Sequence, residues 1–292
     1  MNKRGRRKSS KKITKTLKML GANAAGIKSK MTTLKKIVSE ENVNIFFLQE
    51  TKNRETGQIK LDSDFIIFER VRPIRDGGGG VALGCQKDLC PVWVREGEDK
   101  VETISVNITI KSMAIRLCSG YAPQENDDKE DKEAFWKYLD EDVEQAENTG
   151  AGYVLQMDGN LWAGKEIIPN DPRKRNKNGK LFSEFLDRHP DLSVLNALPQ
   201  CEGLITRRRI YKDGKIAESV LDFFVVCKRV LPHIIKMKID EKKEFVLTNY
   251  TRSNKGKKPT DSDHATEIVE AKLEVDPIKP ERKHIFTFHN KK

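Results

Sequence analysis

Tyr153-Val154-Leu155-Gln156-Met157-Asp158-Gly159-Asn160 is the stretch that decides the fold class. Its first five residues are mostly apolar and too few for a helix, so they predict a buried strand. The strand ends in Asp158 and Asn160, which are polar groups that a plain hydrophobic core would not select. Asp and Asn also close turns, so one such strand end says little about function by itself.

Polar residues follow three other apolar runs in the same way. The three runs are Leu17–Leu20 before Asn23, Ile45–Leu48 before Gln49-Glu50, and Ile115–Cys118 before Ser119-Gly120-Tyr121. Each polar group is delivered by a rigid element to the point where the chain turns, which is where a pre-organised site is best built. Asp222 differs because it lies inside the apolar run Val220–Val226, where a buried carboxylate costs several kcal/mol unless it is paired.

Strand-like runs outnumber helical patterns along the chain. The predicted strands are Leu17–Leu20, Ile45–Leu48, Phe65–Phe68, Val81–Leu83, Ile104–Ile110, Ala114–Cys118, Tyr153–Met157, Val220–Val226 and Phe245–Leu247. The predicted helices are Thr32–Glu41, Lys132–Glu147 and Leu181–Arg188. This mixture predicts an α/β (α+β) fold of stacked sheets flanked by helices rather than a parallel doubly wound sheet. Gly77–Gly80 lies between two predicted strands without a following Gly-Lys-Ser/Thr, which favours a hairpin turn over a phosphate-binding loop.

The positive charge of the chain lies in its ends. The formal net charge is +11 over 292 residues; residues 1–18 contribute +9 and residues 276–292 contribute +3, which leaves −1 for residues 19–275. We expect a basic disordered leader over residues 1–16, one domain over 17–275 and a basic C-terminal tail over 276–292. The leader is alternatively a nuclear address or a phosphate-binding arm. Global charge therefore does not show that the domain itself binds nucleic acid.

Five cysteines, no two at Cys-x-x-Cys spacing, suggest neither a zinc site nor a disulfide framework. The N-terminal segment lacks the apolar core of a secretion signal, and no apolar run approaches the roughly 20 residues that span a bilayer. We expect an intracellular, nuclear protein that does not enter a membrane. Nothing in the sequence implies a stable protein partner.

Glu50, Asp158 and Asp263 offer the hard oxygen ligands that Mg²⁺ or Mn²⁺ prefers, and no His or Cys cluster offers a softer alternative. His264 follows Asp263 directly and adds an imidazole that can carry a proton or hold a phosphoryl oxygen near neutral pH. A lone Asp-His pair would be weak evidence. The implied ion is Mg²⁺ or Mn²⁺.

Six short motifs occur in an order that resembles the endonuclease/exonuclease/phosphatase superfamily across residues 17–275. They are Asn23, Leu48-Gln49-Glu50-Thr51, Gly120-Tyr121-Ala122-Pro123, Asp158-Gly159-Asn160, Ser219-Val220-Leu221-Asp222-Phe223 and Ser262-Asp263-His264. Thr206-Arg207 and the complete Ser-Asp-His tripeptide look most like the apurinic-type endonuclease domain of non-LTR (LINE-type) retrotransposons. The resemblance implies a four-layer α/β sandwich of two packed mixed β-sheets flanked by helices, with the site at one rim of the sheets.

The resemblance also implies roles for the motif residues. Glu50 would ligate the metal, with Asn23 beside it and Asp263 contributing to the same site. Thr206, Arg207, Ser262 and Ser219 are implied substrate-binding residues.

The resemblance implies five residues that act on the reacting groups. Asp158 would orient or deprotonate the attacking water, and Asn160 would hold a phosphate oxygen. His264 would contact the scissile phosphate while Asp222 fixes its tautomer, and Tyr121 would lie against the phosphate or the leaving group. Such a division suits a phosphodiester, because its negative charge repels nucleophiles and must be neutralised.

Two positions depart from the superfamily pattern. Ala25 stands where relatives often have Asn or Asp, and Gly159 replaces the usual bulky residue between Asp158 and Asn160. The first change removes a possible hydrogen bond from the site without touching the main metal ligand.

Membership of a superfamily implies the type of chemistry but not the substrate, so local features of the sequence must indicate the substrate. An inositol-phosphatase-like Pro-Ala-Trp-Cys-Asp-Arg segment is absent from the sequence. Basic clusters at Arg173–Lys177, Arg207–Lys212 and Lys255–Lys258 suit backbone phosphates, although they are also typical of solvated loops. We therefore predict a Mg²⁺-dependent endonuclease that nicks DNA and leaves a 3′-hydroxyl. The alternatives are a phosphatase or phosphodiesterase acting on a smaller ester, and a catalytically weakened nucleic-acid-binding module of the same fold.

Overall fold

The computed structural model describes residues 13–72, 79–111, 113–242, 244, 247 and 263–275. These residues form two large β-sheets, one two-stranded hairpin, three α-helices and four short 3-10 helices. The predicted leader, the C-terminal tail, the cluster Lys255–Lys258 and Ser262 lie outside the described residues, except that the first strand begins at Ile13.

The first sheet has seven strands. In spatial order they are β10 (Cys201–Glu202), β14 (Ile234–Ile239), β15 (Glu267–Val275), β1 (Ile13–Asn23), β2 (Ile45–Gln49), β4 (Val81–Gln86) and β3 (Phe65–Arg70). β1 and β2 at its centre run parallel, and β1 is antiparallel to β15.

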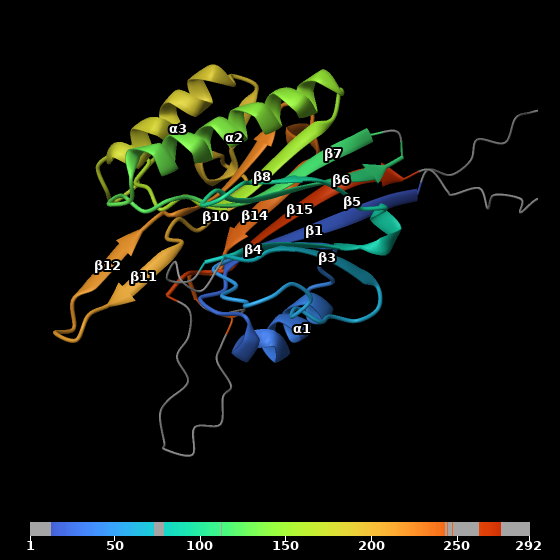
Figure 1. Cartoon of the computed structure of the whole chain (residues 1–292), viewed down its shortest axis with the longest axis horizontal. Coiled ribbons are helices and arrows are strands. Elements are labelled where there is room, and N and C mark those ends of the chain that lie inside the picture. Colours follow the sequence, from blue (N-terminus) through green and yellow to red (C-terminus); the bar gives the residue numbers. More distant parts are fainter. Residues whose placement is uncertain are drawn as a thin grey trace, which may run out of the picture.

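The second sheet has six strands. In spatial order they are β5 (Val92–Glu96), β6 (Glu102–Ile110), β7 (Met113–Tyr121), β8 (Gly152–Asp158), β13 (Asp222–Cys227) and β9 (Leu192–Val194). β7 and β8 at its centre run parallel, and β13 is antiparallel to β8. A separate hairpin of β11 (Arg207–Ile210) and β12 (Ile216–Ser219) projects from one end of the molecule (Figure 1).

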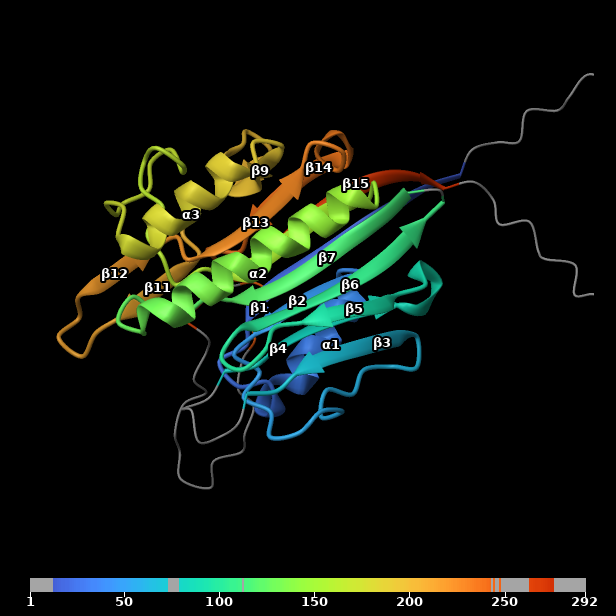
Figure 2. The same ribbon diagram turned by 45° about the horizontal axis from the view of Figure 1, so that its top comes forward.

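Helices cover the outer faces of both sheets. α1 (Met31–Glu40) lies against the first sheet, and α2 (Lys129–Asn148) and α3 (Lys177–Arg188) lie against the second (Figures 1 and 2). The 3-10 helices are η1 (Lys28–Lys30), η3 (Lys87–Leu89), η4 (Leu195–Ala197) and η5 (Leu231–His233). The result is the four-layer α/β sandwich that the sequence resemblance predicted.

This layering explains the continuous apolar runs in the sequence. All five residues of β2 and all seven of β8 are buried, because each strand has a helix on one face and the other sheet on the opposite face. Strands covered on both faces lose the alternation of apolar and polar residues. The amphipathic α2 buries Phe135, Leu139 and Val143 on the stripe that the sequence predicted.

The parallel strand pairs place their carboxyl ends at one edge of the sandwich. Asn23 ends β1, Gln49 ends β2, Tyr121 ends β7 and Asp158 ends β8. The antiparallel β13 begins at that same edge with Asp222. Residues widely separated along the chain are therefore collected at one rim.

The predicted elements correspond to the three helices and to the strands β1, β2, β3, β4, β6, β7, β8 and β13. The sequence did not predict β5, β9, β10, β14 or β15, nor the hairpin β11–β12. Edge and hairpin strands such as β5 and β11 are half exposed and rich in charge, so they lack an apolar run. The glycine run falls in the connection between the antiparallel β3 and β4, as the predicted hairpin requires, and residues 73–78 of this connection are not described. Apart from Leu247, the predicted strand Phe245–Leu247 is also outside the described residues.

Candidate active site

Strand register brings three site residues side by side. Tyr121 on β7 is the Cα partner of Asp158 on β8, and Asp158 is the Cα partner of Asp222 on β13. Neighbouring strands lie about 4.8 Å apart, so the three side chains share a small volume at the rim. One residue of slippage would turn each side chain to the other face of the sheet, so this register builds the site.

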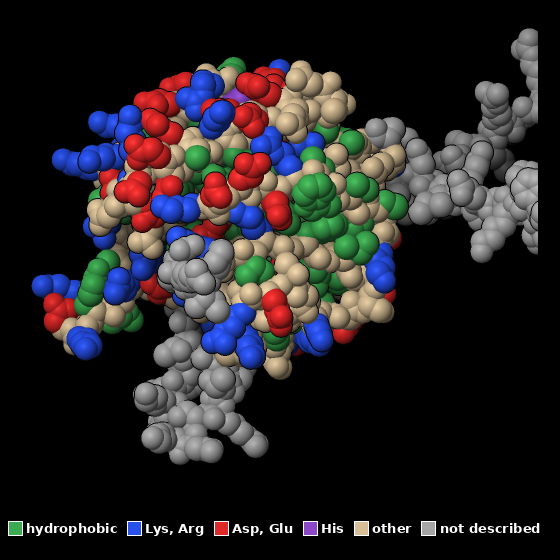
Figure 3. All heavy atoms as spheres, in the orientation of Figure 1, with side chains coloured by type: hydrophobic (Ala, Val, Ile, Leu, Met, Phe, Trp, Pro, Cys, Tyr) green, Lys and Arg blue, Asp and Glu red, His purple; other side chains and the backbone are tan. Residues whose placement is uncertain are grey.

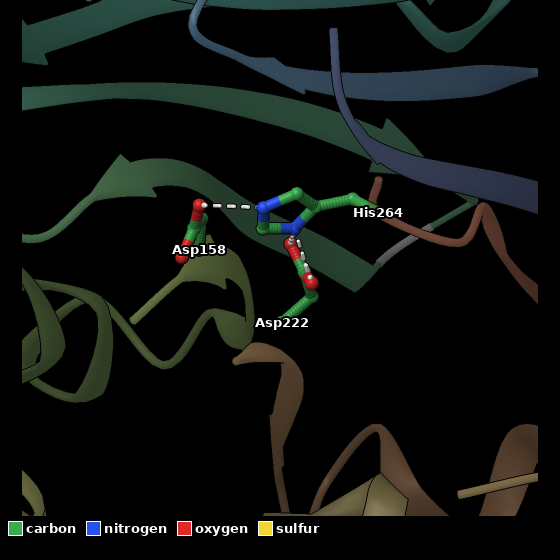
Figure 4. Close-up of side chains that lie close together, drawn as sticks. All are labelled: Asp158, Asp222 and His264. Carbon is green, nitrogen blue, oxygen red and sulfur yellow. Dashed lines mark hydrogen bonds and ion pairs between the residues drawn. The ribbon is translucent and has the colours of Figure 1, made fainter. Parts of the chain in front are cut away.

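His264 lies between the carboxylates of Asp158 and Asp222 (Figure 4). Its Nδ1 is 2.8 Å from Asp222 Oδ2, and its Nε2 is 3.9 Å from Asp158 Oδ2. The imidazole side chain is 6% exposed and the Asp158 side chain 1%. A carboxylate on Nδ1 fixes the ring so that Nε2 faces Asp158 and the rim.

The charges of this group shift its proton affinities. Burial opposes protonation of His264, but the neighbouring carboxylates of Asp222 and Asp158 outweigh it and raise the His264 pKa to about 9. Burial, and then the charge of Asp222, raises the pKa of Asp158. Two carboxylates this close resist joint ionisation, and the protonated imidazole between them relieves the repulsion.

Glu50 follows β2 and is reached by three donors. Its Oε1 accepts from Asn23 Nδ2 at 3.1 Å and from the Tyr121 hydroxyl at 3.1 Å, while Lys52 Nζ lies 2.8 Å from Oε2. Burial raises the Glu50 pKa, but Lys52 and the two hydrogen-bond donors outweigh it and lower the pKa overall. The side chain is 22% exposed, so this carboxylate is ionised and open to solvent.

Asn23 joins Glu50 to the Asp158–His264 group. Its Nδ2 also donates to Asp158 Oδ2 at 2.7 Å, and its Oδ1 accepts from the Ala25 amide at 2.9 Å. The contacts thus run without a break from Glu50 through Asn23 and Asp158 to His264.

Four residues at this rim have left-handed backbone although none is glycine. The φ angles are 42° at Ala25, 46° at Glu50, 52° at Lys52 and 45° at Asn160. Non-glycine residues in this region cost of order 1–3 kcal/mol each and cluster at functional sites. Ala25 occupies a conformation that Asn or Asp adopts more readily, which gives the departure noted in the sequence a physical meaning.

Asp263 stands at the exposed side of the group. Its Oδ2 accepts from Arg207 Nε at 2.9 Å, and its Oδ1 is 4.0 Å from His264 Nε2. The side chain is 38% exposed. Burial raises the Asp263 pKa, but His264 and Arg207 outweigh it and lower the pKa overall. Arg207, predicted to bind substrate, is thus paired with a site carboxylate.

Thr206 and Ser219 are both buried rather than presented at the rim. The Thr206 hydroxyl accepts from the backbone amides of Leu221 and Asp222 at 2.8 and 3.0 Å, and the Ser219 carbonyl accepts from the Thr206 amide. These contacts fix the start of β13, so they favour a positioning role over the direct substrate contact predicted from the sequence. Ser262 lies outside the described residues.

Asn160 ties two loops together. Its backbone amide donates to Asp158 Oδ1 at 3.0 Å, and its side-chain amide donates to the Ala122 carbonyl at 2.8 Å. These bonds hold the turns after β7 and β8 against each other.

Sequence reasoning missed Lys52 and Glu102. Glu102 on β6 is buried, bonds Arg72 Nη1 at 2.8 Å and accepts from the Gly80 amide. The carbonyls of Gly80 and Gly79 in turn accept from the amides of Thr51 and Lys52. Glu102 therefore helps to hold the turn that carries Glu50. The only available signal was an acidic residue at the start of an apolar run.

The oxygen donors at this rim fit a divalent cation. Glu50 and Asp263 have lowered pKa values and reach solvent, and the Lys52 ammonium beside Glu50 shows that a cation is stable at that carboxylate. Asp158, Asp222 and His264 also have potential ligand atoms within 4.8 Å of one another. However, Nδ1 of His264 is engaged by Asp222, and all three side chains are buried, so an ion there would have to displace this contact. The buried triplet is better suited to hold a proton, and the exposed carboxylates to hold the ion.

The two packed sheets have the fold of solved structures from the endonuclease/exonuclease/phosphatase family, which is the fold that the sequence motifs predicted. No protein-family model and no curated protein sequence matches the chain.

Three solved structures illustrate the similarity. The endonuclease domain of TRAS1, a telomere-specific non-LTR retrotransposon, has a TM-score of 0.61 at 18% identity over 88% of this chain and 99% of that chain. The AP endonuclease from Leishmania major has a TM-score of 0.65 at 14% identity over 88% of each chain. The 3′ phosphatase NExo from Neisseria, bound to a product DNA hairpin, has a TM-score of 0.62 at 16% identity over 87% of this chain and 99% of that chain. At these identities the similarity shows the fold alone.

Proposed function

We propose that this protein is a divalent-metal-dependent endonuclease that hydrolyses a phosphodiester bond in one DNA strand and leaves a 3′-hydroxyl. The observation that carries the proposal is the His264 imidazole held between Asp222 and Asp158 and connected through Asn23 to the solvent-reaching Glu50. The similarity to DNA-processing enzymes of the same fold supports the choice of substrate.

Asp158 has the place and the proton affinity of a general base. In the proposed step it accepts a proton from water, whose oxygen forms a bond to phosphorus while the bond from phosphorus to the 3′-oxygen breaks. The raised pKa of Asp158 brings it toward the operating pH, where a base is most effective. The 3′-oxygen takes a proton from solvent water as it leaves, which gives the 3′-hydroxyl and a 5′-phosphate.

His264 and Tyr121 act on the phosphate side. Protonated His264, fixed by Asp222, offers an N–H to a phosphoryl oxygen and offsets charge that develops there. Burial, and then the charges of Asp158 and Glu50, raises the Tyr121 pKa, so its hydroxyl keeps its proton and donates a hydrogen bond. Glu50, with Asn23 and Asp263, would hold Mg²⁺ or Mn²⁺, which supplies charge neutralisation for the phosphate and the leaving oxygen.

The β11–β12 hairpin supports a nucleic-acid substrate. It starts at Arg207, next to Asp263, and projects away from the sheets with basic and apolar side chains exposed (Figures 1 and 3). Its exposed residues include Arg209, Ile210, Tyr211 and Lys212. A basic, aromatic-bearing projection beside a phosphodiesterase site suits a long polyanion better than a small ester.

Nicking of supercoiled plasmid tests the proposal directly. We expect conversion to open circles with Mg²⁺ or Mn²⁺, none with EDTA, and nicks that a DNA polymerase extends because they end in a 3′-hydroxyl. Glu50→Gln, Asp158→Asn and His264→Gln should each reduce nicking by orders of magnitude, whereas Glu270→Gln, on β15 away from the rim, should leave it unchanged. A wild-type protein that binds the plasmid but never cuts it would show instead a nucleic-acid-binding module that has lost catalysis.

A second candidate is removal of a terminal 3′-phosphate from DNA, which is favoured by the similarity to the Neisseria 3′ phosphatase. The same base and imidazole would serve a phosphate monoester. An oligonucleotide with a 3′-phosphate, assayed beside the plasmid, separates the two. Faster phosphate release than nicking, at equal enzyme concentration, would assign the protein to 3′-end processing. Release of phosphate from inositol phosphates without any action on DNA would remove DNA as the substrate.

A further inference from the structure

A layer of buried polar side chains lies between the sheets, one residue layer below the rim. Its members come from strands of both sheets and from η4, and they are Gln49, Ser119, Gln156, Asn196 and Glu267. Buried polar groups are costly unless they are hydrogen-bonded, so a connected layer of them in a sandwich core calls for a functional reason.

Glu267 is the acidic member of this layer. It is the first residue of β15, three residues after His264, and its side chain is fully buried. Its Oε1 accepts from Asn196 Nδ2 at 3.3 Å and its Oε2 from Gln156 Nε2 at 3.2 Å. Among the described residues no lysine or arginine forms an ion pair with it, so amide groups alone receive the carboxyl group.

Asn196 connects Glu267 to the start of β13. Its Nδ2 also donates to the Asp222 carbonyl at 3.0 Å, and its Oδ1 accepts from the Phe224 amide at 3.1 Å. Glu267 and Asn196 therefore bridge the strand that begins beside His264 and the strand that begins with Asp222. This bridge links the same two segments of the chain as the hydrogen bond between the His264 imidazole and the Asp222 carboxylate.

Gln156, on the second sheet, connects Glu267 to β2, the strand of the first sheet that precedes Glu50. Its Oε1 accepts from Gln49 Nε2 at 2.6 Å, and Gln49 precedes Glu50. Gly21 on β1 is the Cα partner of Glu267, and a Cβ there would lie 2.7 Å from the Gln156 side chain. The missing side chain at Gly21 leaves the space through which Gln156 reaches across the sandwich.

We propose that Glu267 is a positioning residue of this site, a role that rests on the proposed function. Its buried carboxyl group contacts Asn196 and Gln156. Through these two amides it locks the strand after His264 to the strands that carry Asp222, Asp158 and Glu50. The lock sets where the imidazole meets its two carboxylates. Glu267 contacts no reacting atom.

The surroundings of Glu267 disfavour its charged form. The titratable groups that face it are Asp222 from β13, His264 before β15 and Cys201 from β10, while β14 offers Ile239 and β1 offers Gly21. Burial, and then the charge of Asp222, raises the pKa of Glu267 well above its ordinary range. A charged Glu267 would compete with Asp222 and Asp158 for the positive charge of the His264 imidazole. The neutral acid is therefore the form compatible with the site.

Glu267→Gln and Glu267→Ala test this role without relying on hydrolysis. The Nδ1–H proton of His264, bonded to Asp222, gives a low-field NMR signal that is identified by its loss in His264→Gln. We expect the signal to persist in Glu267→Gln, because a neutral amide replaces a neutral acid, and to shift or vanish in Glu267→Ala. An unchanged signal in Glu267→Ala, or its loss in both variants, overturns the proposal.

The pH dependence of the melting temperature provides a second test. It needs only wild type and Glu267→Gln, so it can be carried out even if Glu267→Ala does not fold. A raised folded-state pKa means that stability present below the unfolded pKa is lost as pH rises. As pH rises above about 4.5, the wild type should therefore lose roughly 3 °C more per pH unit than Glu267→Gln. Glu270→Gln, a change on the same strand whose carboxylate pairs with Lys18 and Lys236, should keep the wild-type slope. Equal slopes in wild type and Glu267→Gln would show that residue 267 is not a neutral acid and would overturn the proposal.

Nicking kinetics then complete the assignment. We expect kcat of Glu267→Ala to fall on the order of 10- to 100-fold with KM nearly unchanged, and Glu267→Gln to stay within about threefold of wild type. A wild-type protein without nicking activity would refute the proposed function, while the NMR and melting results would still decide the position of Glu267.

Discussion

Two buried aspartates in the second sheet and its covering helix face opposite surroundings. Asp142 on α2 is fully buried, pairs with Arg116 Nη1, and accepts from the Ser105 and Tyr153 hydroxyls at 2.7 and 3.2 Å. Asp158 on β8 is equally buried, but it faces the carboxylate of Asp222 and has an imidazole at 3.9 Å in place of a guanidinium in contact.

Because of this difference, the Asp142 carboxylate stabilises the fold, whereas the Asp158 carboxylate is available for proton transfer. The Arg116 guanidinium lies in direct contact with Asp142 and offsets its charge, so the pair acts as a fixed connection between β7 and α2. Asp158 is under-compensated, which raises its pKa and leaves it able to exchange a proton. The same residue type at the same depth thus has two uses, and its neighbours decide which.

The sharpest test of this contrast is neutralisation of Asp158. Asp158→Asn should reduce nicking by about 10²–10⁴-fold, because the general base is lost. The free energy of unfolding at pH 8 should stay the same or rise, because a carboxylate facing Asp222 is removed. Plasmid nicking rates and urea unfolding of the same preparation measure both. A large loss of stability would show that Asp158 is a structural residue like Asp142.

Arg116→Met should have the reverse result. It leaves Asp142 buried without its cation, which costs about 3–5 kcal/mol of stability in comparable buried pairs. Nicking per folded molecule should be unchanged, since the cluster lies beneath α2 rather than at the rim. Urea unfolding, with activity corrected for the folded fraction, checks this. The contrast fails if nicking falls as far as it does in Asp158→Asn.

Stability should fall as pH rises through the range in which His264 loses its proton. The folded-state pKa of about 9 lies above the unfolded value of about 6.5, so the folded protein binds more protons between them. The contribution is fully present below pH 6.5, declines as pH rises and is lost above pH 9, amounting to about 3 kcal/mol. Urea unfolding at pH 6 and pH 9.5 should show a smaller decline in His264→Gln than in wild type. His233→Gln, at the distant η5, serves as the matched control and should keep the wild-type decline.

The smallest expected effect concerns the hairpin. Arg209→Ala with Lys212→Ala should weaken DNA binding and lower the slope of log K against log salt by about 0.9 per lost phosphate contact, while kcat changes little. Fluorescence anisotropy with a DNA duplex at several salt concentrations measures the slope. Lys36→Ala on α1, on the opposite outer layer, should leave the slope unchanged. An unchanged slope in the hairpin variant would remove the hairpin from the DNA-binding surface.

The sequence by itself determined the three helices and several of the central strands. β2, β8 and β13 are covered on both faces, so their apolar runs are visible without any structure. It also identified Asp222 correctly as unusual, because a carboxylate inside an apolar run has few explanations. The hairpin and the edge strand β5 could not be predicted, since half-exposed strands carry charge and lose the pattern.

Only the tertiary structure decided which polar residues meet. Asp158 and Asp222 are 64 positions apart in the chain and become Cα partners through an antiparallel register that no local pattern specifies. Likewise, Gln156 and Glu267 looked like ordinary polar residues beside apolar runs until the packing of the two sheets placed them in contact. Burial and turn formation are properties of short segments, so the sequence alone sets which residues form strands and helices and where these end. The register and stacking of distant strands set which charged groups lie beside each side chain, and therefore which chemistry that side chain can perform.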